Sequence, residues 1–338
     1  MDRTSRNSLW SGGSRAAVFS MIFTTLVCVA NLQAQSLVIS EIHYHPLDAL
    51  VSLDGTNVVD GDEFEFIEVR NRGALPYELN GVSFVSGVSY TFSPYSLAAG
   101  DCVVVVENAA FFTNRYPWVT NVAPGQYGGK LSNGGESLIL EDNLGSPLFS
   151  VDYSDGGAWP GSADGEGRSL MLANPAGDPN DPASWCASAE LHGSPGSTGV
   201  CRFADVVLNE VLSHSDPPLE DAIELYNLSG AAVDLNGWYL SDDFIQPRKF
   251  RITNTVVNAG GYTVFYEYQF NTNALFNTNN IPFALSSLGD ELILTAPFPN
   301  SERLRLVDML NFGATVTDVS MGRFPDGSGD FVNLESLT

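Results

Sequence analysis

Short apolar runs rich in Val, Ile, Leu, Phe and Tyr recur along the chain, and Gly, Asn, Asp and Pro separate them. Beyond the N-terminal region, no segment keeps an apolar residue at every third or fourth position, so the pattern does not predict long amphipathic helices. Many short strands with turn residues between them are typical of β-sandwiches. The sequence therefore predicts an all-β fold. The predicted strands are Leu37–Ile42, Phe64–Val69, Val103–Val106, Ser137–Leu140, Val206–Val211, Ala222–Tyr226, Tyr262–Tyr266 and Glu291–Leu294.

The second half of the chain repeats motifs of the first half in the same order. The matched pairs are Ser40-Glu41-Ile42 with Asn209-Glu210-Val211, Phe66 to Asn71 with Ala222 to Asn227, Leu79-Asn80-Gly81 with Leu235-Asn236-Gly237, Gly135 to Leu140 with Gly289 to Leu294, and Gly167-Arg168 with Gly322-Arg323. The spacing between the second and third motifs is also the same in both halves. Chance does not preserve both order and spacing, so we infer an internal duplication.

Taken together, these motifs resemble the lamin tail domain, the immunoglobulin-like module of nuclear lamin tails that also occurs in exported bacterial proteins. The second copy fits better, because it has Trp238 where the first copy has Val82. The resemblance implies two tandem immunoglobulin-like β-sandwiches, over residues 36–175 and 204–338, with a binding or architectural role. The residues that carry it are Glu41, Glu68, Asn71 and Gly81 in the first copy and Glu210, Glu224, Asn227, Gly237 and Trp238 in the second.

The N-terminus has the features of a secretory signal peptide. Three arginines precede an apolar run from Ala16 to Ala30, and the small residue Ala34 follows. This run is shorter than the roughly 20 residues that span a bilayer, so we expect cleavage after Ala34 rather than a permanent anchor. Residues 1–34 are thus predicted to direct export, and the mature protein is expected to be secreted or held at the cell surface without a membrane span.

Residues 176–203 are rich in Gly, Pro, Asp and Ser and are predicted to form the tail of the first module and a linker. Cys186 and Cys201 lie in this segment, and an exported chain meets an oxidising environment, so we expect them to form a disulfide. Cys102 lies in a run of valines and is expected to be a buried free thiol. The second copy has a shorter tail than the first, so its tail is expected to be incomplete in this chain.

The charge of the chain restricts its partners. It has 15 Lys and Arg against 40 Asp and Glu, a net charge of −25 at pH 7. Nucleic acids and anionic membranes both attract basic surfaces, so this balance argues against either as a partner. The acidic residues are dispersed and 44% of all residues are hydrophobic, which predicts a folded core rather than disorder.

His43 and His45 form the sharpest metal-like motif. Alternate residues of a strand share one face, so two imidazoles at this spacing could converge on Zn²⁺. However, Pro46 ends the strand at once, and the second copy offers only His214 in the matching region. The preferred interpretation is a strand end with exposed imidazoles.

Acidic loops supply oxygen ligands of the kind that Ca²⁺ prefers, with Asp60 and Asp62 as the weak candidates. None of these loops has EF-hand spacing, so solvated turns, in which Asp and Asn bond their own backbone, are the preferred interpretation. No cofactor is predicted. The loops are Asp54 to Asp62, Asp178 to Asp181 and Asp326 to Asp330.

Several glutamates raise the hypothesis of a glycosidase, because such enzymes use a pair of acids. Matched acids within a duplicated motif favour a structural role instead, in which they accept backbone N–H bonds. The chain also has no Gly-rich phosphate loop, Gly-x-Ser-x-Gly or Cys-x-x-Cys motif. We therefore predict that the chain is not an enzyme. The glutamates concerned are Glu41, Glu65, Glu68, Glu210 and Glu224.

Two functional classes remain after this exclusion. The preferred hypothesis is a non-catalytic exported binding or architectural protein that mediates interactions at the cell surface or outside the cell. The alternative is a carbohydrate-binding accessory region of a larger secreted hydrolase, because exposed aromatic rings stack on sugars. The partner, a protein or a polysaccharide, is not identified. The aromatic set considered for this role is Tyr90, Phe92, Tyr95, Phe111, Phe112, Tyr116 and Trp118.

Overall fold

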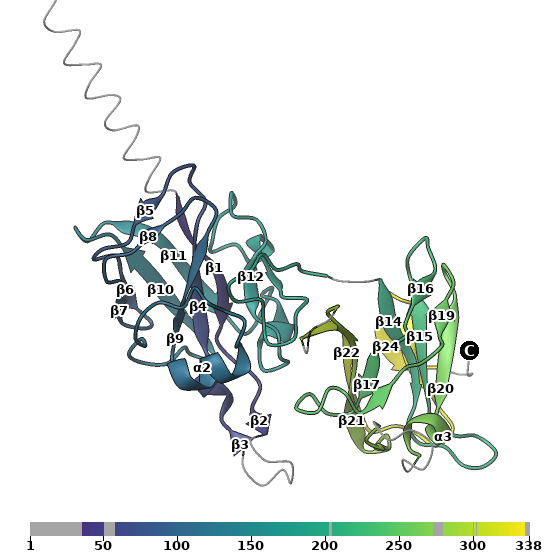
Figure 1. Ribbon diagram of the computed structural model, residues 1–338. Coiled ribbons are helices and arrows are strands. Elements are labelled where there is room, and N and C mark those ends of the chain that lie inside the picture. Colours follow the sequence, from purple (N-terminus) through teal and green to yellow (C-terminus); the bar gives the residue numbers. More distant parts are fainter. Residues whose placement is uncertain are drawn as a thin grey trace, which may run out of the picture.

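The structure, a computed structural model, describes residues 36–50, 58–202, 205–272, 280–299, 301 and 303–334. Antiparallel strands dominate these residues, which confirms the all-β prediction. Figure 1 shows two groups of packed sheets that follow one another along the chain, the first purple to teal and the second green to yellow. The predicted signal peptide, residues 1–34, lies outside the described residues.

The first module packs a five-stranded sheet against a four-stranded sheet. The five-stranded sheet has the order β13 (Trp185–Ala187), β12 (Leu170–Leu172), β1 (Leu37–His43), β4 (Phe66–Asn71) and β9 (Cys102–Val106). The four-stranded sheet has the order β11 (Pro147–Ser154), β10 (Gly135–Glu141), β6 (Ser83–Ser86) and β7 (Tyr90–Thr91). Two small ribbons complete the module: β5 (Tyr77–Glu78) with β8 (Ser96–Leu97), and β2 (Ala49–Leu50) with β3 (Val58–Val59).

The second module repeats this plan. Its five-stranded sheet has the order β20 (Tyr262–Tyr266), β15 (Ala222–Asn227), β14 (Val206–Leu212), β23 (Met321–Phe324) and β24 (Asp330–Asn333). Its four-stranded sheet has the order β18 (Phe250–Arg251), β17 (Tyr239–Ser241), β21 (Gly289–Pro297) and β22 (Leu304–Gly313). A ribbon of β16 (Val233–Asp234) and β19 (Val256–Val257) completes it.

Each module has one hydrophobic core between its two sheets. In the first, Ile67 and Val69 of β4 meet Leu138 and Leu140 of β10. In the second, Ile223 and Leu225 of β15 and Leu292 and Leu294 of β21 belong to the core. Successive residues of a strand point to opposite faces, so the residues between these core positions lie on the outer face of the five-stranded sheet. Both modules are therefore β-sandwiches of the immunoglobulin-like kind.

A buried asparagine at the end of a strand organises the same turn in both modules. The side-chain amide of Asn71 donates to the carbonyls of Leu75 and Leu97, at 2.9 Å each. The amide of Asn227 donates to the carbonyls of Ala231 and Val257, at 2.7 and 3.0 Å. The asparagine of the duplicated Glu-x-x-Asn motif therefore has the same role in both modules: its amide donates to carbonyl groups of the turn, which need a donor because they are buried.

The strand register corrects one of the matches made from the sequence. Glu41 lies opposite Met171 on β12, and Glu210 lies opposite Gly322 on β23. The counterpart of Gly322 is thus Met171, and the match of Gly167-Arg168 with Gly322-Arg323 is wrong by four positions. Arg168 lies just before β12, whereas Arg323 lies within β23. The two arginines therefore do not occupy the same position, because strand pairing and not residue identity defines the register.

Short helices interrupt the strand pattern. They are η1 (Gly61–Phe64), α2 (Ala109–Arg115), η2 (Gly161–Ala163), η3 (Pro182–Ser184) and α3 (Glu267–Phe270). Asn108 caps α2, because its side chain accepts from the N–H groups of the first turn. Phe112 of α2 and the following Tyr116 pack on Phe66, at 5.8 Å between ring centroids in each case. In the first module, α2 therefore covers part of the outer face. No helix in the described part of the chain is long and apolar enough to cross a membrane.

Most of the segment predicted as tail and linker packs on the first module and extends to the second. After β13, Ala189 and Leu191 pair with β22: Leu191 N–H donates to Leu304 C=O at 3.0 Å, and Leu306 N–H donates to Ala189 C=O at 2.8 Å. Glu190 between them forms an ion pair with Arg303. The segment thus adds to the edge of the four-stranded sheet of the second module, which covers an otherwise open strand edge.

Candidate functional site

A pair of glutamates on the outer face is the most distinctive polar feature that the two modules share. Glu41 lies opposite Glu68 on the neighbouring strand, and Glu210 lies opposite Glu224. A β-bulge precedes each pair, at Ser40 in the first module and at Asn209 in the second. Bulges re-aim side chains and recur near functional sites, so the shared bulge makes the two pairs comparable.

The side chain at each bulge donates to the glutamate across the sheet. The hydroxyl of Ser40 donates to Glu68 Oε1 at 2.6 Å, and the amide of Asn209 donates to Glu224 Oε1 at 2.9 Å. Arg70 also donates to Glu68 Oε1, at 2.7 Å. Side chains thus act as donors to Glu68 and Glu224, where the sequence predicted backbone N–H donors.

In the first module, the chain itself closes over the glutamate pair. Residues 192–197, which we call the capping loop, lie on the outer face between β13 and the second module. Ser194 donates its N–H to Glu41 Oε1 at 2.6 Å and its hydroxyl to Glu41 Oε2 at 2.9 Å. Gly196 donates its N–H to Glu68 Oε2 at 2.9 Å. Both carboxylates are consequently buried.

The capping loop approaches so closely that glycine is needed at two positions. Gly193 and Gly196 have φ values of +81° and +76°, in the left-handed region. A Cβ on Gly193 would lie 2.8 Å from Glu41 Oε1 and 3.1 Å from the ring of Phe66. The sequence His-Gly-Ser-Pro-Gly-Ser of the loop is therefore suited to present main-chain N–H groups to the two carboxylates.

Burial changes the acidity of the first pair. Desolvation raises the pKa of Glu41 to about 8, and the nearby Glu68 raises it further, while the hydrogen bonds from Ser169 and Ser194 act in the opposite direction. The three donors stabilise the charged form, and the two close carboxylates disfavour double ionisation. We therefore expect Glu41 to hold a proton near neutral pH.

In the second module, the matched face is an open groove of about 390 Å³. Its lining residues on the sheet are Glu210, Leu212, Ala222, Glu224, Val264 and Tyr266, and Pro218, Leu219, Glu220 and Tyr268 form its walls. The strand registers make the six sheet residues the counterparts of Glu41, His43, Phe66, Glu68, Val104 and Val106. The strand face that α2 and the capping loop cover in the first module therefore lines a groove in the second, at whose base Glu210 and Glu224 are 6% and 7% exposed.

The hydrogen-bond network of the second pair differs from that of the first at one buried serine. In the first module, Ser169 donates its hydroxyl to Glu41. Its counterpart Ser320, which also precedes the outer strand, is 1% exposed, and its hydroxyl has no hydrogen-bond partner among the described residues. Burial raises the pKa of Glu224, and the bond from Asn209 acts against this rise. Among the described residues, Ser320 thus does not supply the hydrogen bond that Ser169 donates in the first module.

The two histidines predicted as a metal-like motif do not come together. His43 is fully buried, with its ring edge-on to Phe66 at 5.4 Å, so the expectation of an exposed imidazole at this position is wrong. Burial, with the Arg115 charge, lowers the pKa of His43 to about 3, so the ring is neutral. His45 lies beyond the strand end and contacts Asp164, 2.6 Å from Nδ1 to Oδ1. The residues that bury His43 come from segments far away in the sequence, among them Arg115 and His192. The local pattern of the strand therefore could not predict that His43 is buried.

The acidic loops use their oxygens for turns and caps. Asp60 accepts from the N–H of Asp62 at 3.0 Å, and Asp62 forms an ion pair with Lys130. Asp178 and Asp181 accept backbone N–H groups two residues ahead. Of the candidate loop residues, Asp54 and Gly55 lie outside the described residues. In the described ranges, no three His, Cys, Asp or Glu side chains are grouped to hold a metal ion.

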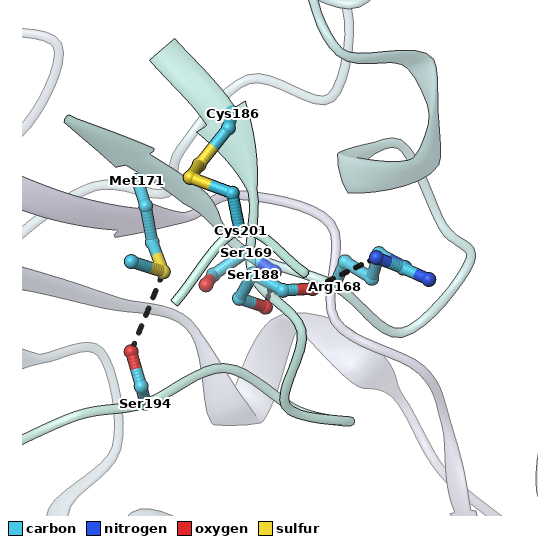
Figure 2. Close-up of a disulfide and its surroundings, with 7 residues drawn as sticks. All are labelled: Arg168, Ser169, Met171, Cys186, Ser188, Ser194 and Cys201. Carbon is cyan, nitrogen blue, oxygen red and sulfur yellow. Dashed lines mark hydrogen bonds between the residues drawn. A yellow bond between two sulfur atoms is a disulfide. The ribbon is translucent and has the colours of Figure 1, made fainter. Parts of the chain in front are cut away.

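Cys186 and Cys201 form a disulfide in the structure. The bond lies next to the capping loop, as Figure 2 shows: Ser194 contacts Met171 beneath the disulfide, with 3.6 Å between its hydroxyl and the sulfur. The two cysteines flank the capping loop in sequence, so the bond constrains its ends. Cys102 is a buried free thiol, and burial raises its pKa to about 12.

The remaining motif residues are structural. Gly81 and Gly237 have φ values of +79° and +88°, which the turn before the next strand requires. Trp238 follows directly and is 8% exposed, as part of the second core. Of the aromatic set in the first copy, Tyr95 and Trp118 are exposed, whereas most of the others are buried.

The second module is thus an immunoglobulin-like sandwich with a glutamate pair and a groove on one outer face. Residues 202–314 match the family model of the lamin tail domain. This match confirms the resemblance to the lamin tail domain that the motifs of the second module predict.

Comparisons beyond the family add little. No curated protein matches the chain. A crystal structure of an exo-chitosanase from Amycolatopsis orientalis is similar at 12% identity and a TM-score of 0.18, over 75% of this chain and 26% of that chain. The present chain thus spans about a quarter of the length of that enzyme. At this TM-score the likeness carries no argument.

Proposed function

We propose that the chain is a non-catalytic exported binding protein, and that the groove over Glu210 and Glu224 is its binding surface. The match of residues 202–314 to the lamin tail domain model supports a binding or architectural role. The export assignment rests on the predicted signal peptide and on the Cys186–Cys201 disulfide, because disulfides persist in oxidising compartments.

One observation carries the assignment of the surface. The six sheet residues that line the groove match, position by position, the residues that α2 and the capping loop bury in the first module. The matched glutamate pair thus lies under the capping loop in the first module and at a groove among the described residues of the second. A groove with apolar walls and a few convergent polar groups is the usual form of a binding site.

The glutamate pairs support recognition rather than catalysis. In the first module, main-chain and hydroxyl donors seal Glu41 and Glu68 from any substrate. In the second, Glu224 is held by the Asn209 amide, which fixes its orientation as an acceptor. Glu65, the remaining acid of the glycosidase hypothesis, is buried and accepts from Tyr127 and Leu131.

A second candidate is carbohydrate binding, favoured by the aromatic side chains beside the groove. Tyr266 and Tyr268 are exposed, and their rings are nearly parallel, with an interplanar angle of 8°. Exposed tyrosine rings next to carboxylates suit the apolar faces and hydroxyls of sugars. This candidate places the ligand at the rim of the groove rather than over the glutamates.

The experiment that tests the proposal compares the wild-type chain with Val264→Arg, which fills the groove. The control is Val256→Arg, which adds the same charge at an exposed position of the small ribbon. Each protein is probed against a displayed peptide library and a glycan array. We expect specific binders that Val264→Arg loses and Val256→Arg keeps; binders that ignore both substitutions would contradict the assignment of the surface. Selective loss of glycan binding in Tyr268→Ala would support the second candidate.

A further inference from the structure

We propose that a cavity between the two modules binds an acidic sugar, with Arg115 as the counter-ion of its carboxylate and Trp118 as the surface for its ring. We call it the arginine cavity, because three arginines line it: Arg115, Arg248 and Arg303. It shares no described lining residue with the groove of the second module. The proposed site is therefore independent of the proposed function.

Contacts between the modules hold the walls of the arginine cavity in place. The end of α2 and the residues that follow it form one wall, and residues 247–248 and 303–304 of the second module form another. The N–H of Leu191 donates to the carbonyl of Leu304 at 3.0 Å, and both leucines belong to a buried apolar cluster. The cavity has a volume of about 420 Å³, which is within the range of small-molecule sites.

The charge of the cavity is opposite to that of the whole chain. The chain has 15 Lys and Arg against 40 Asp and Glu, yet the described residues that line the cavity include three arginines and no acid. A hollow lined by one sign of charge attracts ligands of the other sign. Glu190, which is not among the lining residues, already forms an ion pair with Arg303. Arg115 is therefore the cation to which the proposed site assigns the ligand.

Arg115 has no balancing carboxylate among the described residues. Its Nη2 donates to the carbonyl of Leu47 at 2.8 Å, and its Cζ lies 3.3 Å from the centroid of the Phe64 ring. Its Nη1 is buried and has no hydrogen-bond partner in the described part of the chain. Burial also lowers the pKa of Arg115, so the surroundings disfavour its charge. Since a guanidinium stays protonated, an anion in the cavity would offset the cost of burying this charge.

His192 brings a second unsatisfied polar atom to the same cavity. Its Nδ1 is buried and has no hydrogen-bond partner among the residues that the structure describes. Burial lowers the pKa of His192 well below its usual range, so the ring is neutral and can donate one N–H. The hydroxyl of Tyr116 donates to the carbonyl of His192 at 2.8 Å, which fixes this residue. Buried polar atoms normally have partners, so two such atoms on lining residues indicate a ligand that supplies acceptors.

Trp118 makes an acidic sugar the favoured ligand class. Its side chain lines the cavity and is 42% exposed. The ring of Tyr116 meets it edge-on at 5.8 Å, and the Cζ of Arg303 lies 5.0 Å from its ring centroid, so the indole is held in place. A fixed indole suits the apolar face of a sugar ring, and a guanidinium suits a carboxylate. A sugar that carries a carboxylate uses both groups.

The test titrates the full chain with methyl glycosides of glucuronic, galacturonic and mannuronic acid, each beside its neutral parent sugar. Isothermal titration calorimetry at low salt measures the affinities. We expect at least one acid to bind about tenfold or more tightly than its parent, because only the acid pairs with Arg115. If no acid binds more tightly than its parent up to the millimolar range, the proposal is wrong. This comparison uses the wild-type chain alone and does not depend on the folding of a variant.

Arg115→Gln removes the proposed counter-ion and should weaken binding of the preferred acid about tenfold or more. Arg251→Gln, at an exposed position of β18, removes the same charge elsewhere and should bind as the wild type does. Equal affinities of the two variants would overturn the assignment to Arg115.

Trp118→Ala separates an acidic sugar from an acidic peptide without a change of charge. Because the ring is exposed, the variant should fold, and it should bind the preferred acid about tenfold more weakly. N-acetylglutamate amide is the peptide probe and should bind the wild type more weakly than the sugar acid does. Tight binding of this probe that Trp118→Ala leaves unchanged would assign the cavity to an acidic peptide and overturn the sugar assignment.

Val264→Arg separates this site from the groove of the second module. It alters only the groove, so the affinity for the preferred acid should equal that of the wild type. Loss of this affinity in Val264→Arg would place the sugar in the groove and contradict the proposal. Failure of the groove as a binding surface, in contrast, would leave the expected results at Arg115 and Trp118 unchanged.

Discussion

Glu210 lies in the second module where Glu41 lies in the first: each follows a β-bulge and each lies opposite a glutamate on the neighbouring strand. What covers the two residues differs. The capping loop donates to Glu41, whereas Glu210 lines a groove. The duplication thus provides an internal control, because any effect of a substitution at one pair can be compared with the matched substitution at the other.

The buried asparagines should be essential to both modules. Asn227→Ala leaves the carbonyls of Ala231 and Val257 without their donor, and we expect the second module to lose about 2–3 kcal/mol of stability. Asn71→Ala should have a similar effect on the first module. Chemical denaturation monitored by circular dichroism measures both. Asn143→Ala, in the exposed turn after β10, is the control and should change stability by less than about 0.5 kcal/mol.

Trp238 distinguishes a core residue from a sugar platform. It is packed in the second core, so Trp238→Ala should cost about 3–5 kcal/mol. Trp118→Ala, which removes an exposed ring, should cost about 1 kcal/mol or less. Thermal unfolding of the three proteins is the measurement. If Trp238→Ala melts like the wild type but no longer binds polysaccharide, the assignment to the core is wrong.

The disulfide should stabilise the capping loop as well as the fold. Replacing Cys186 and Cys201 by serine should lower stability by about 3 kcal/mol, because the unfolded chain is no longer constrained. Non-reducing peptide mapping of exported protein should find these two cysteines joined. Cys102 should stay unmodified by iodoacetamide until the protein is denatured, since burial holds its pKa at about 12. Two free thiols at 186 and 201 would refute the prediction.

Glu65 gives the first module a pH dependence with a defined sign. Burial raises its pKa from 4.5 to about 8, so the folded state favours the protonated form. This contribution to stability is fully present below about pH 4.5 and is lost as the pH rises through about 8. Glu65→Gln mimics the protonated acid and keeps an acceptor for Tyr127 and Leu131. Its melting temperature should exceed that of the wild type at pH 8 by a few degrees and match it near pH 5; a larger difference at pH 5 would reverse the sign and contradict the account.

The sequence predicted the elements that local pattern determines. Each of the eight predicted strands lies wholly or largely within an observed strand, because alternating or continuous Val, Ile and Leu favour strands wherever they are buried. It did not predict α2, which is only seven residues long. The packing of Phe112 on Phe66, rather than helix propensity, stabilises so short a helix.

The site depends on contacts that local pattern does not encode. The glutamate pairs were found as motifs, but the contact between Ser194 and Glu41 joins residues 153 positions apart. For the same reason His43 was expected to be exposed, although cover from distant segments buries it. One signal in the sequence was available: the Gly-Ser-Pro-Gly stretch lies between the two cysteines of the first copy.

The central claim is that one outer face is open in the second module while its duplicate is covered in the first. It is tested most directly by thiol labelling of Val264→Cys and Val104→Cys in the native full chain, because these residues lie opposite Glu224 and Glu68 at matched positions. The wild-type chain gives the background from Cys102. We predict rapid labelling of Val264→Cys by a small maleimide and labelling of Val104→Cys only after unfolding. Protection of Val264→Cys to the same degree as Val104→Cys would contradict the account.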